Sequence, residues 1–151
     1  MKAIKVIFAL ILIAVIGAGI VGFFVDNATS KDLTDNLSAI PLPVNTTIEA
    51  TTHKTGRLNT SALQFYGAVL LRSTQPYAKL KSYYKAKAPA DLDYRILRLK
   101  DAKTDPEFKD LDPELRFSYH DEMPENYYIL YSMTTTGKQP FPMMDYRSYF
   151  G

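Results

Sequence analysis

The hydrophobic pattern of the chain changes once, after Val25. Residues Val6–Val25 read VIFALILIAVIGAGIVGFFV and contain no charged or polar side chain. Beyond this run, apolar residues occur in short alternating or helical patterns between polar turns. About 20 apolar residues at about 1.5 Å each make a helix of roughly 30 Å, the thickness of a bilayer's hydrocarbon core. The pattern therefore predicts a transmembrane helix followed by a domain on one side of the membrane.

The flanks of the apolar run predict its orientation. Lys2 and Lys5 precede it, and lysines favour the cytoplasmic side of a span. The run is longer than the apolar stretch of a signal peptide, and Asp26 and Ala28 make a poor cleavage site after it. We therefore expect an uncleaved single-pass anchor over residues 1–26 in the cell membrane, with a cytoplasmic N-terminus and an extracytoplasmic C-terminal domain.

Residues 27–45 have the composition of a linker. They are rich in Thr, Ser, Asn and Asp and end in Pro41-Leu42-Pro43. Thr29 or Ser30 is expected to cap a short helix, and the prolines are expected to impose an extended path, so the segment is interpreted as a stalk. N-x-[ST] triplets begin at Asn27, Asn36, Asn45 and Asn59. They would accept glycans in a eukaryotic secretory protein, or they follow by chance from the composition.

Residues 46–151 predict an α+β domain. Alternating or β-branched patterns favour strands at Val44–His53, Ser61–Ser73, Tyr94–Lys100, Leu115–His120 and Asn126–Thr135, and a helical stripe of Tyr77, Leu80 and Tyr84 favours one main helix that ends before Pro89. We expect an antiparallel sheet of about five strands with this helix packed on it. Ser61–Ser73 is apolar on nearly both faces, which is typical of a central strand, and Gly67 within it indicates a bulge or the close approach of a helix.

Two further segments carry weaker patterns. Asp105-Pro106-Glu107-Phe108 and Asp112-Pro113-Glu114-Leu115 both resemble helix starts, and they predict short helical turns or a loop. The tail from Gln139 to Gly151 is too apolar for a loose end, so much of it is expected to pack on the domain.

Composition and charge exclude several function classes. The net charge of +2 is too near neutral for a nucleic-acid-binding domain, and aromatic residues at 13% are sufficient for a folded core. The chain has no cysteine, which excludes disulfides, thiolate metal sites and cysteine nucleophiles. We expect no cofactor, no metal site and no catalytic residue.

One cluster has the residue types for acid–base chemistry. His120-Asp121-Glu122 places a histidine beside two carboxylates, and the second histidine, His53, meets it only if their two strands pair. A hydrolase that uses His120 is one hypothesis. The simpler interpretation, which we favour, is a histidine at a strand end next to solvated acids in a turn.

A basic, tyrosine-rich stretch is the main candidate for binding. Its cationic residues are Lys79, Lys81, Lys85, Lys87, Arg95 and Arg98, interleaved with tyrosines. On the outer side of a membrane such a face would suit anionic lipid headgroups or anionic wall polymers. The alternative is an ordinary solvated helix face that the acidic stretch 101–125 balances in charge.

Several of these segments also carry a family resemblance. LPV at 42–44 preceded by Pro41, GRLN at 56–59, LQFYGAVLLRS at 63–73 and NYYILYSM at 126–133 resemble an uncharacterised group of small, N-terminally anchored proteins of Gram-positive bacteria. In place of the further Asn and Gly that follow the Gly-x-Leu-Asn turn in those proteins, this chain has Thr60-Ser61-Ala62. The resemblance implies a bacterial envelope setting and no known activity, so no functional residue is transferred.

Three functional hypotheses follow from the sequence. The first is a non-enzymatic, membrane-tethered extracytoplasmic module that binds another envelope protein or an anionic envelope polymer or lipid. The second is an accessory or structural subunit of a membrane protein complex. The third is the hydrolase that uses His120.

Overall fold

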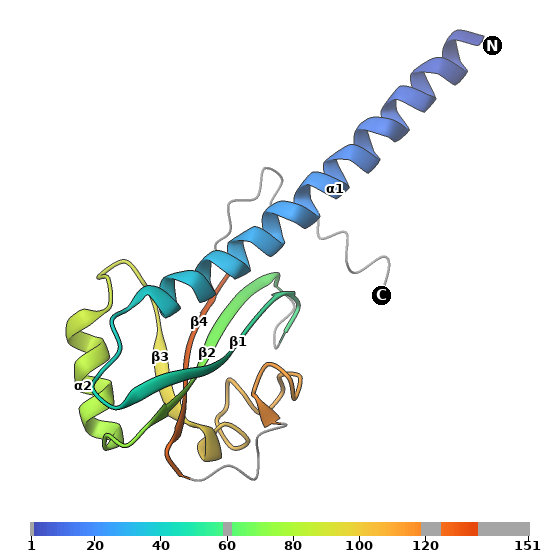
Figure 1. The fold of residues 1–151 in the computed structure, drawn as a ribbon. Coiled ribbons are helices and arrows are strands. Elements are labelled where there is room, and N and C mark those ends of the chain that lie inside the picture. Colours follow the sequence, from blue (N-terminus) through green and yellow to red (C-terminus); the bar gives the residue numbers. More distant parts are fainter. Residues whose placement is uncertain (1, 59–61, 119–124, 136–151) are drawn as a thin grey trace.

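The computed structural model describes residues 2–58, 62–118 and 125–135 of the chain. Their fold is α+β, as expected (Figure 1). The long helix α1, Lys2–Ala39, precedes the strands β1, Thr46–Gly56, and β2, Gln64–Ser73. The helix α2, Tyr77–Lys87, and the strand β3, Arg95–Arg98, follow, then the short 3-10 helix η1, Leu99–Asp101, and the strand β4, Tyr127–Thr134.

Helix α1 joins the apolar run to the domain without a break. It is long and apolar enough to cross a membrane, and its N-terminal side chains such as Ile7 and Phe8 are more than half exposed. Farther along, Ser30, Thr34 and Leu37 are buried on one face of the same helix, against the sheet. The expected helix start at Thr29 or Ser30 is therefore wrong. Residues 27–39, the first part of the expected stalk, are helical and belong to the packed domain.

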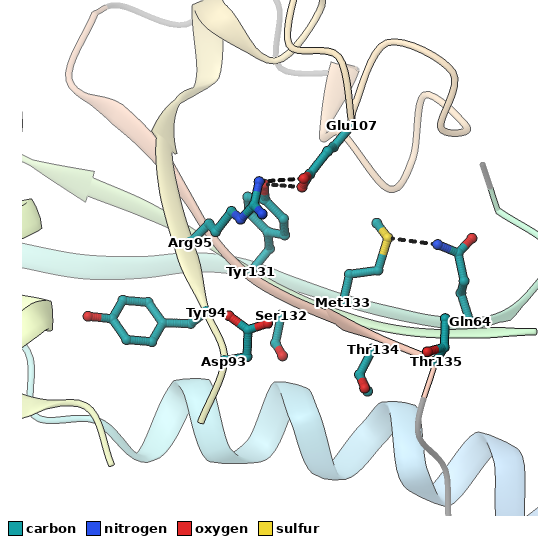
Figure 2. Close-up of a pocket in the computed structure, with 10 residues that line it drawn as sticks. All are labelled: Gln64, Asp93, Tyr94, Arg95, Glu107, Tyr131, Ser132, Met133, Thr134 and Thr135. Carbon is teal, nitrogen blue, oxygen red and sulfur yellow. Dashed lines mark hydrogen bonds and ion pairs between the residues drawn. The ribbon is translucent and has the colours of Figure 1, made fainter. Parts of the chain in front are cut away.

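The described residues form a four-stranded antiparallel sheet in the order β1-β2-β4-β3. Strand β2 pairs with β1 on one side and with β4 on the other, which confirms it as a central strand. Strand β3 pairs with β4 only from Tyr128 to Tyr131, and the chain before β3 diverges from the end of β4 (Figure 2). Among the described residues, Ser132 and Met133 of β4 therefore have no strand partner on the β3 side.

The strand expected at Leu115–His120 is not present in the described part of that range, residues 115–118. The Leu115 and Ser118 amides donate to the carbonyls of Asp112 and Pro113, so the segment forms consecutive turns. Phe117 has a φ of 54°, which is incompatible with an extended strand. The sheet of the described residues therefore has one strand fewer than expected. The end of the expected strand, at His120, and the tail 139–151 lie outside the described residues.

Each face of the sheet carries its own hydrophobic layer. On one face, Val69, Leu71 and Leu130 pack with side chains of α1 and α2, among them Leu37 and Leu80. On the other face, the turns between η1 and β4 cover the sheet with Phe108, Leu111, Leu115 and Phe117 (Figure 1). The predicted Asp-Pro turns therefore form one of the two hydrophobic layers.

Helix α1 makes its closest approach to the sheet at Gly67. A Cβ atom built at Gly67 would lie 2.7 Å from the Thr34 backbone nitrogen, 2.7 Å from its Oγ1 and 2.8 Å from the Cβ of Leu33. Real Cβ atoms do not tolerate such distances, so only glycine fits here. The expected close approach of a helix to Gly67 is confirmed, and the helix is α1.

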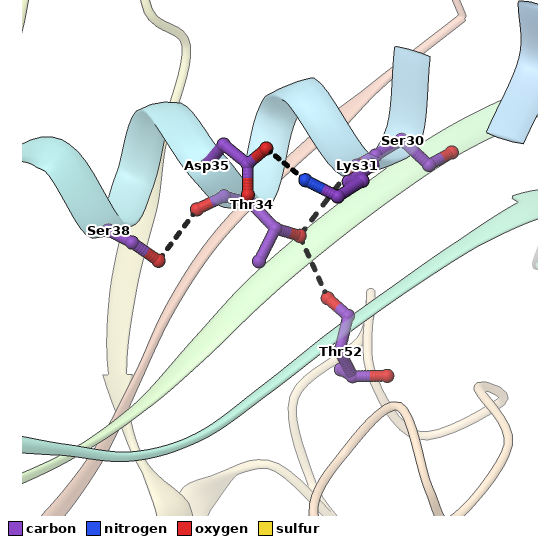
Figure 3. A network of polar contacts seen from close by, with 6 residues as sticks. All are labelled: Ser30, Lys31, Thr34, Asp35, Ser38 and Thr52. Atoms are coloured by element: carbon purple, nitrogen blue, oxygen red, sulfur yellow. Dashed lines mark hydrogen bonds and ion pairs between the residues drawn. The ribbon is translucent and has the colours of Figure 1, made fainter. Parts of the chain in front are cut away.

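Hydroxyl groups of α1 bind the backbone of strand β1 beside this contact. The Thr34 hydroxyl donates to the Thr52 carbonyl at 3.0 Å (Figure 3). The Ser30 hydroxyl donates to the Lys54 carbonyl at 3.0 Å, one helical turn earlier. Both carbonyls belong to β1, an edge strand, and both are partly buried. Each hydroxyl therefore supplies a hydrogen-bond partner to a carbonyl that has limited access to water. The small hydroxyl side chains of α1 thus allow the helix to lie close to the sheet and also to form hydrogen bonds with it.

We predict that Gly67→Ala destabilises the domain. The added methyl group would force α1 away from β2, and overpacking of this kind costs about 1–3 kcal/mol. Gly56→Ala is the matched control, because a Cβ there would meet its nearest heavy atom, Leu58 Cδ2, at 3.9 Å. Urea unfolding of the full chain in detergent, followed by tyrosine near-ultraviolet circular dichroism, measures both variants. Equal free energies of unfolding for Gly67→Ala and Gly56→Ala would contradict the close contact.

The Tyr84 hydroxyl generates a second prediction. Tyr84 is fully buried, and its hydroxyl has no hydrogen-bond partner among the described residues. Tyr84→Phe removes this uncompensated group and is expected to stabilise the chain by about 1 kcal/mol.

The same substitution is expected to reduce alkaline unfolding. Burial raises the pKa of Tyr84 from 10.0 to about 12, so the unfolded chain releases this proton first. Stability is unaffected by this group below pH 10 and falls by about 1.4 kcal/mol per pH unit as the pH rises between the two values. Urea titrations at about pH 8 and about pH 11, on either side of the unfolded pKa, measure both effects. Tyr84→Phe should lose less stability than the parent chain between them. An identical loss would show that Tyr84 ionises as readily in the folded state as in the unfolded state.

Candidate functional site

The candidate site begins with the cationic side of α2. Leu80 and Tyr84 pack against the sheet, as the predicted helical stripe requires. The helix ends at Lys87, before Pro89, and Pro76 is its N-terminal cap residue. Four lysines of α2 are exposed, and we call this set the α2 lysine face: Lys79, Lys81, Lys85 and Lys87.

The α2 lysine face has no acidic partner among the described residues. Three acids of the 101–125 stretch pair with other cations: Glu107 with Arg95, Asp112 with Lys54, and Glu125 with Lys100. The sequence left open a charge balance between this acidic stretch and the basic helix. In the structure these three acids lie elsewhere, so the positive charge of the α2 lysine face is available to a ligand.

The two predicted arginines have partners of their own. Arg95 forms an ion pair with Glu107, and the Arg98 guanidinium lies 5.2 Å from the centre of the Tyr77 ring, in a cation–π contact. Both side chains are exposed. Arg98 therefore contacts a residue of α2, whereas Arg95 contacts the turn that contains Glu107, and both are less free to bind a ligand than the lysines.

A hollow of about 390 Å³ lies between α2 and the start of β3. We call it the α2–β3 hollow. Of the predicted cationic residues it brings together Lys81, Lys85 and Arg95; Lys79, Lys87 and Arg98 are not part of its lining. Its other lining residues are Leu92, Asp93, Tyr94 and Ile96. The structure therefore divides the predicted residues into a group that lines a concave surface and a group that lies outside it.

A second hollow, of about 420 Å³, opens where β3 and β4 diverge (Figure 2). We call it the β3–β4 hollow. Arg95 and Glu107 pair at one side of it, and the Tyr131 hydroxyl donates to the other carboxylate oxygen of Glu107 at 3.1 Å. Burial, and next the neighbouring Glu107 charge, raise the pKa of Tyr131 well above its usual range. Tyr131 therefore stays neutral at physiological pH and acts as a hydrogen-bond donor.

The described lining of the two hollows is largely polar. It contains hydroxyl, amide, carboxylate and cationic groups, and no histidine. No group of three or more potential metal ligands occurs among the described residues. His53 is exposed on β1, opposite Gly67 of β2, while His120 lies outside the described residues. That His53 and His120 lie close to each other therefore stays a prediction.

The sequence could predict the cationic residues but not the two hollows. Both hollows share Asp93, Tyr94 and Arg95, so they depend on the path of the chain just before β3. Of these residues, Tyr94 and Arg95 carry a signal in the sequence, through their places in the basic, tyrosine-rich stretch. No protein-family model, curated protein or solved structure matches this chain. The function must therefore be inferred from the geometry alone.

Proposed function

We propose that this chain is a single-pass, membrane-anchored extracytoplasmic module, without enzymatic activity, whose α2 lysine face binds an anionic partner. The observation that carries this proposal is the set of four exposed lysines with no acidic partner among the described residues. Other described cations, such as Lys54 and Lys100, do have acidic partners. Unpaired like charges on one helix repel each other, and an anionic ligand would relieve that repulsion.

The geometry of α1 disfavours lipid headgroups as the ligand. Ala39 lies about 14 residues beyond Val25, or roughly 21 Å along the helix. Leu37 and Ile40, at that end of α1, pack in the same cluster as Leu80 and Tyr84 of α2. Helix α2 therefore lies at the end of the domain away from the apolar part of α1 (Figure 1). At physiological ionic strength the potential of a charged surface decays over about 8 Å, so a partner in the envelope space suits α2 better than the bilayer does.

The other two hypotheses have less support. An accessory subunit would use the exposed apolar side chains of α1 to contact a partner's span, but a bilayer covers such side chains equally well. A hydrolase would require a pocket around His120, and that residue lies outside the described part of the chain.

The proposed topology is testable with single cysteines, because the chain itself has none. We expect a membrane-impermeant maleimide to label Lys87→Cys in intact bacterial cells and to label Ala3→Cys only after permeabilisation. Both variants should label equally in detergent, which controls for reactivity. Labelling of Ala3→Cys but not Lys87→Cys in intact cells would reverse the orientation.

Removal of the lysine charges is expected to abolish anion binding. The full chain in zwitterionic detergent should be retained on immobilised polyglutamate or polyphosphate at low salt and released as salt increases. The quadruple variant K79Q/K81Q/K85Q/K87Q should elute at much lower salt, while Lys54→Gln, which removes one lysine that already has an acidic partner, should elute close to the parent chain. If the parent chain binds neither polymer, or the quadruple variant elutes with it, the α2 lysine face has no binding role.

A further inference from the structure

The exposed large apolar side chains of the domain gather in one segment. Among the described residues after Phe24, only Leu42, Val44 and Ile48 belong to this kind, and Val44 is 76% exposed. Leu42 and Val44 lie in the loop between α1 and β1. Ile48 pairs with Leu71, which packs with the two helices, so Ile48 lies on the same face of the sheet as α1 and α2. We call Leu42, Val44 and Ile48 the α1–β1 apolar patch.

The four lysines of α2 lie on two flanks of that helix. Lys81 and Lys85 line the α2–β3 hollow, so their flank faces β3. Lys79 and Lys87, with Tyr83 between them, recur at intervals of four residues and therefore share the other flank. This second flank faces the end of α1, because that end and Tyr83 pack in the same hydrophobic cluster. We call it the Lys79–Lys87 flank.

The loop that carries the apolar patch lies beside the Lys79–Lys87 flank. Ile40, where the loop begins, packs in one cluster with side chains of α2. Farther along, the Val44 carbonyl accepts a hydrogen bond from Gln75 Nε2 at 3.3 Å, in the turn just before α2. Both ends of the loop therefore contact α2 or the turn that leads into it, and the loop passes close to α2 in Figure 1. Apolar and cationic side chains thus share one surface.

The acids near this surface are engaged elsewhere. Residues 40–48 contain no charged side chain. Glu49 forms an ion pair with Arg72 at 3.2 Å, and Asp35, near the end of α1, pairs with Lys31 of the same helix. Asp93 lines the α2–β3 hollow, on the opposite flank of α2. The positive charge of the Lys79–Lys87 flank therefore stands next to exposed apolar groups without an acidic partner among the described residues.

This combination selects a ligand with both apolar groups and carboxylates. Polyphosphate would leave Leu42 and Val44 in water. A second copy of the chain would bring the same lysines face to face, which like-charge repulsion disfavours. In the proposed topology the loop follows the far end of α1, so the bilayer around residues 6–25 does not cover it. A partner protein in the envelope space meets both requirements.

We propose that the α1–β1 apolar patch and the Lys79–Lys87 flank together bind an acidic, amphipathic segment of a partner protein. Its apolar side chains would cover Leu42 and Val44, and its carboxylates would lie at Lys79 and Lys87. This inference rests on the proposed function and specifies the class of the anionic partner.

The test measures binding of a synthetic peptide to the full chain in nanodiscs of zwitterionic lipid, with empty nanodiscs as the blank. The probe is an amphipathic helix with leucines on one face and glutamates on the other. One control peptide has alanine for leucine, and a second has glutamine for glutamate. We expect each control peptide to bind about tenfold more weakly, because each lacks one of the two types of contact. An alanine peptide that binds as tightly as the leucine peptide would overturn the proposal.

Double variants of the chain locate the binding surface. Leu42→Ser with Val44→Ser should weaken binding of the leucine peptide about tenfold and leave retention on polyglutamate unchanged, because polyglutamate has no apolar side chain. Lys79→Gln with Lys87→Gln should also weaken peptide binding about tenfold. Lys81→Gln with Lys85→Gln removes the same charge from the other flank and should change it by less than about twofold.

Several outcomes would overturn this inference and leave the proposed function standing, provided that the parent chain binds polyglutamate. They are unchanged peptide binding by the serine variant and equal losses in the two lysine variants. Self-association of the parent chain, or its binding to anionic lipid vesicles, would also overturn the inference if the serine substitutions abolish it, since the patch would then serve a second copy or a bilayer. If neither the peptide nor polyglutamate binds the parent chain, the proposed function fails as well.

Discussion

The contact of α1 with β2 at Gly67 determines how the rest of the molecule is arranged. With no side chain at Gly67, the backbone of α1 at Thr34 lies directly on the central strand. At this short separation the hydroxyls of Ser30 and Thr34 reach backbone carbonyls of β1. A larger residue on either side would separate the helix from the sheet and break these hydrogen bonds. The contact therefore joins a helix with the length and composition of a membrane span to the core of the domain.

Helix α1 is therefore both the apolar N-terminal helix and a part of the domain's hydrophobic core. Because α1 continues from the apolar run into the hydrophobic layer, residues 27–39 provide no flexible linker between the run and the domain. The position of α2 then follows from packing, since Leu37 and Ile40 near the end of α1 contact the cluster that includes Leu80 and Tyr84. The proposed binding surface is thereby held at a fixed distance from the proposed membrane span, and its distance does not depend on the conformation of a linker.

The sequence predicted those parts of the fold in which apolar periodicity dominates. The helix over the apolar run, the central strand β2, the helix α2 and the close approach of a helix to Gly67 are confirmed, because each is marked by a local pattern of apolar or small residues. The packing of residues 27–39 could not be predicted, because the contact surface includes Ser30 and Thr34, whose small polar side chains have the composition of a linker. The strand predicted near Leu115 is wrong because Phe117 adopts a positive φ that no local pattern signals. The cationic residues could be named from the sequence, but the hollows arise from the divergence of β3 and β4, which is a tertiary property.

In the proposed topology, α1 is a rigid spacer that holds α2 away from the bilayer. Fluorescence quenching can test this in nanodiscs whose lipids carry nitroxides on their headgroups, with single fluorophores attached through Asn27→Cys or Lys85→Cys. Asn27 follows the apolar run closely, whereas Lys85 belongs to the helix that packs at the far end of α1. A rigid spacer predicts strong quenching of the fluorophore attached through Asn27→Cys and almost none of that attached through Lys85→Cys. Comparable quenching at the two positions would show that α2 reaches the headgroups and would contradict a rigid spacer.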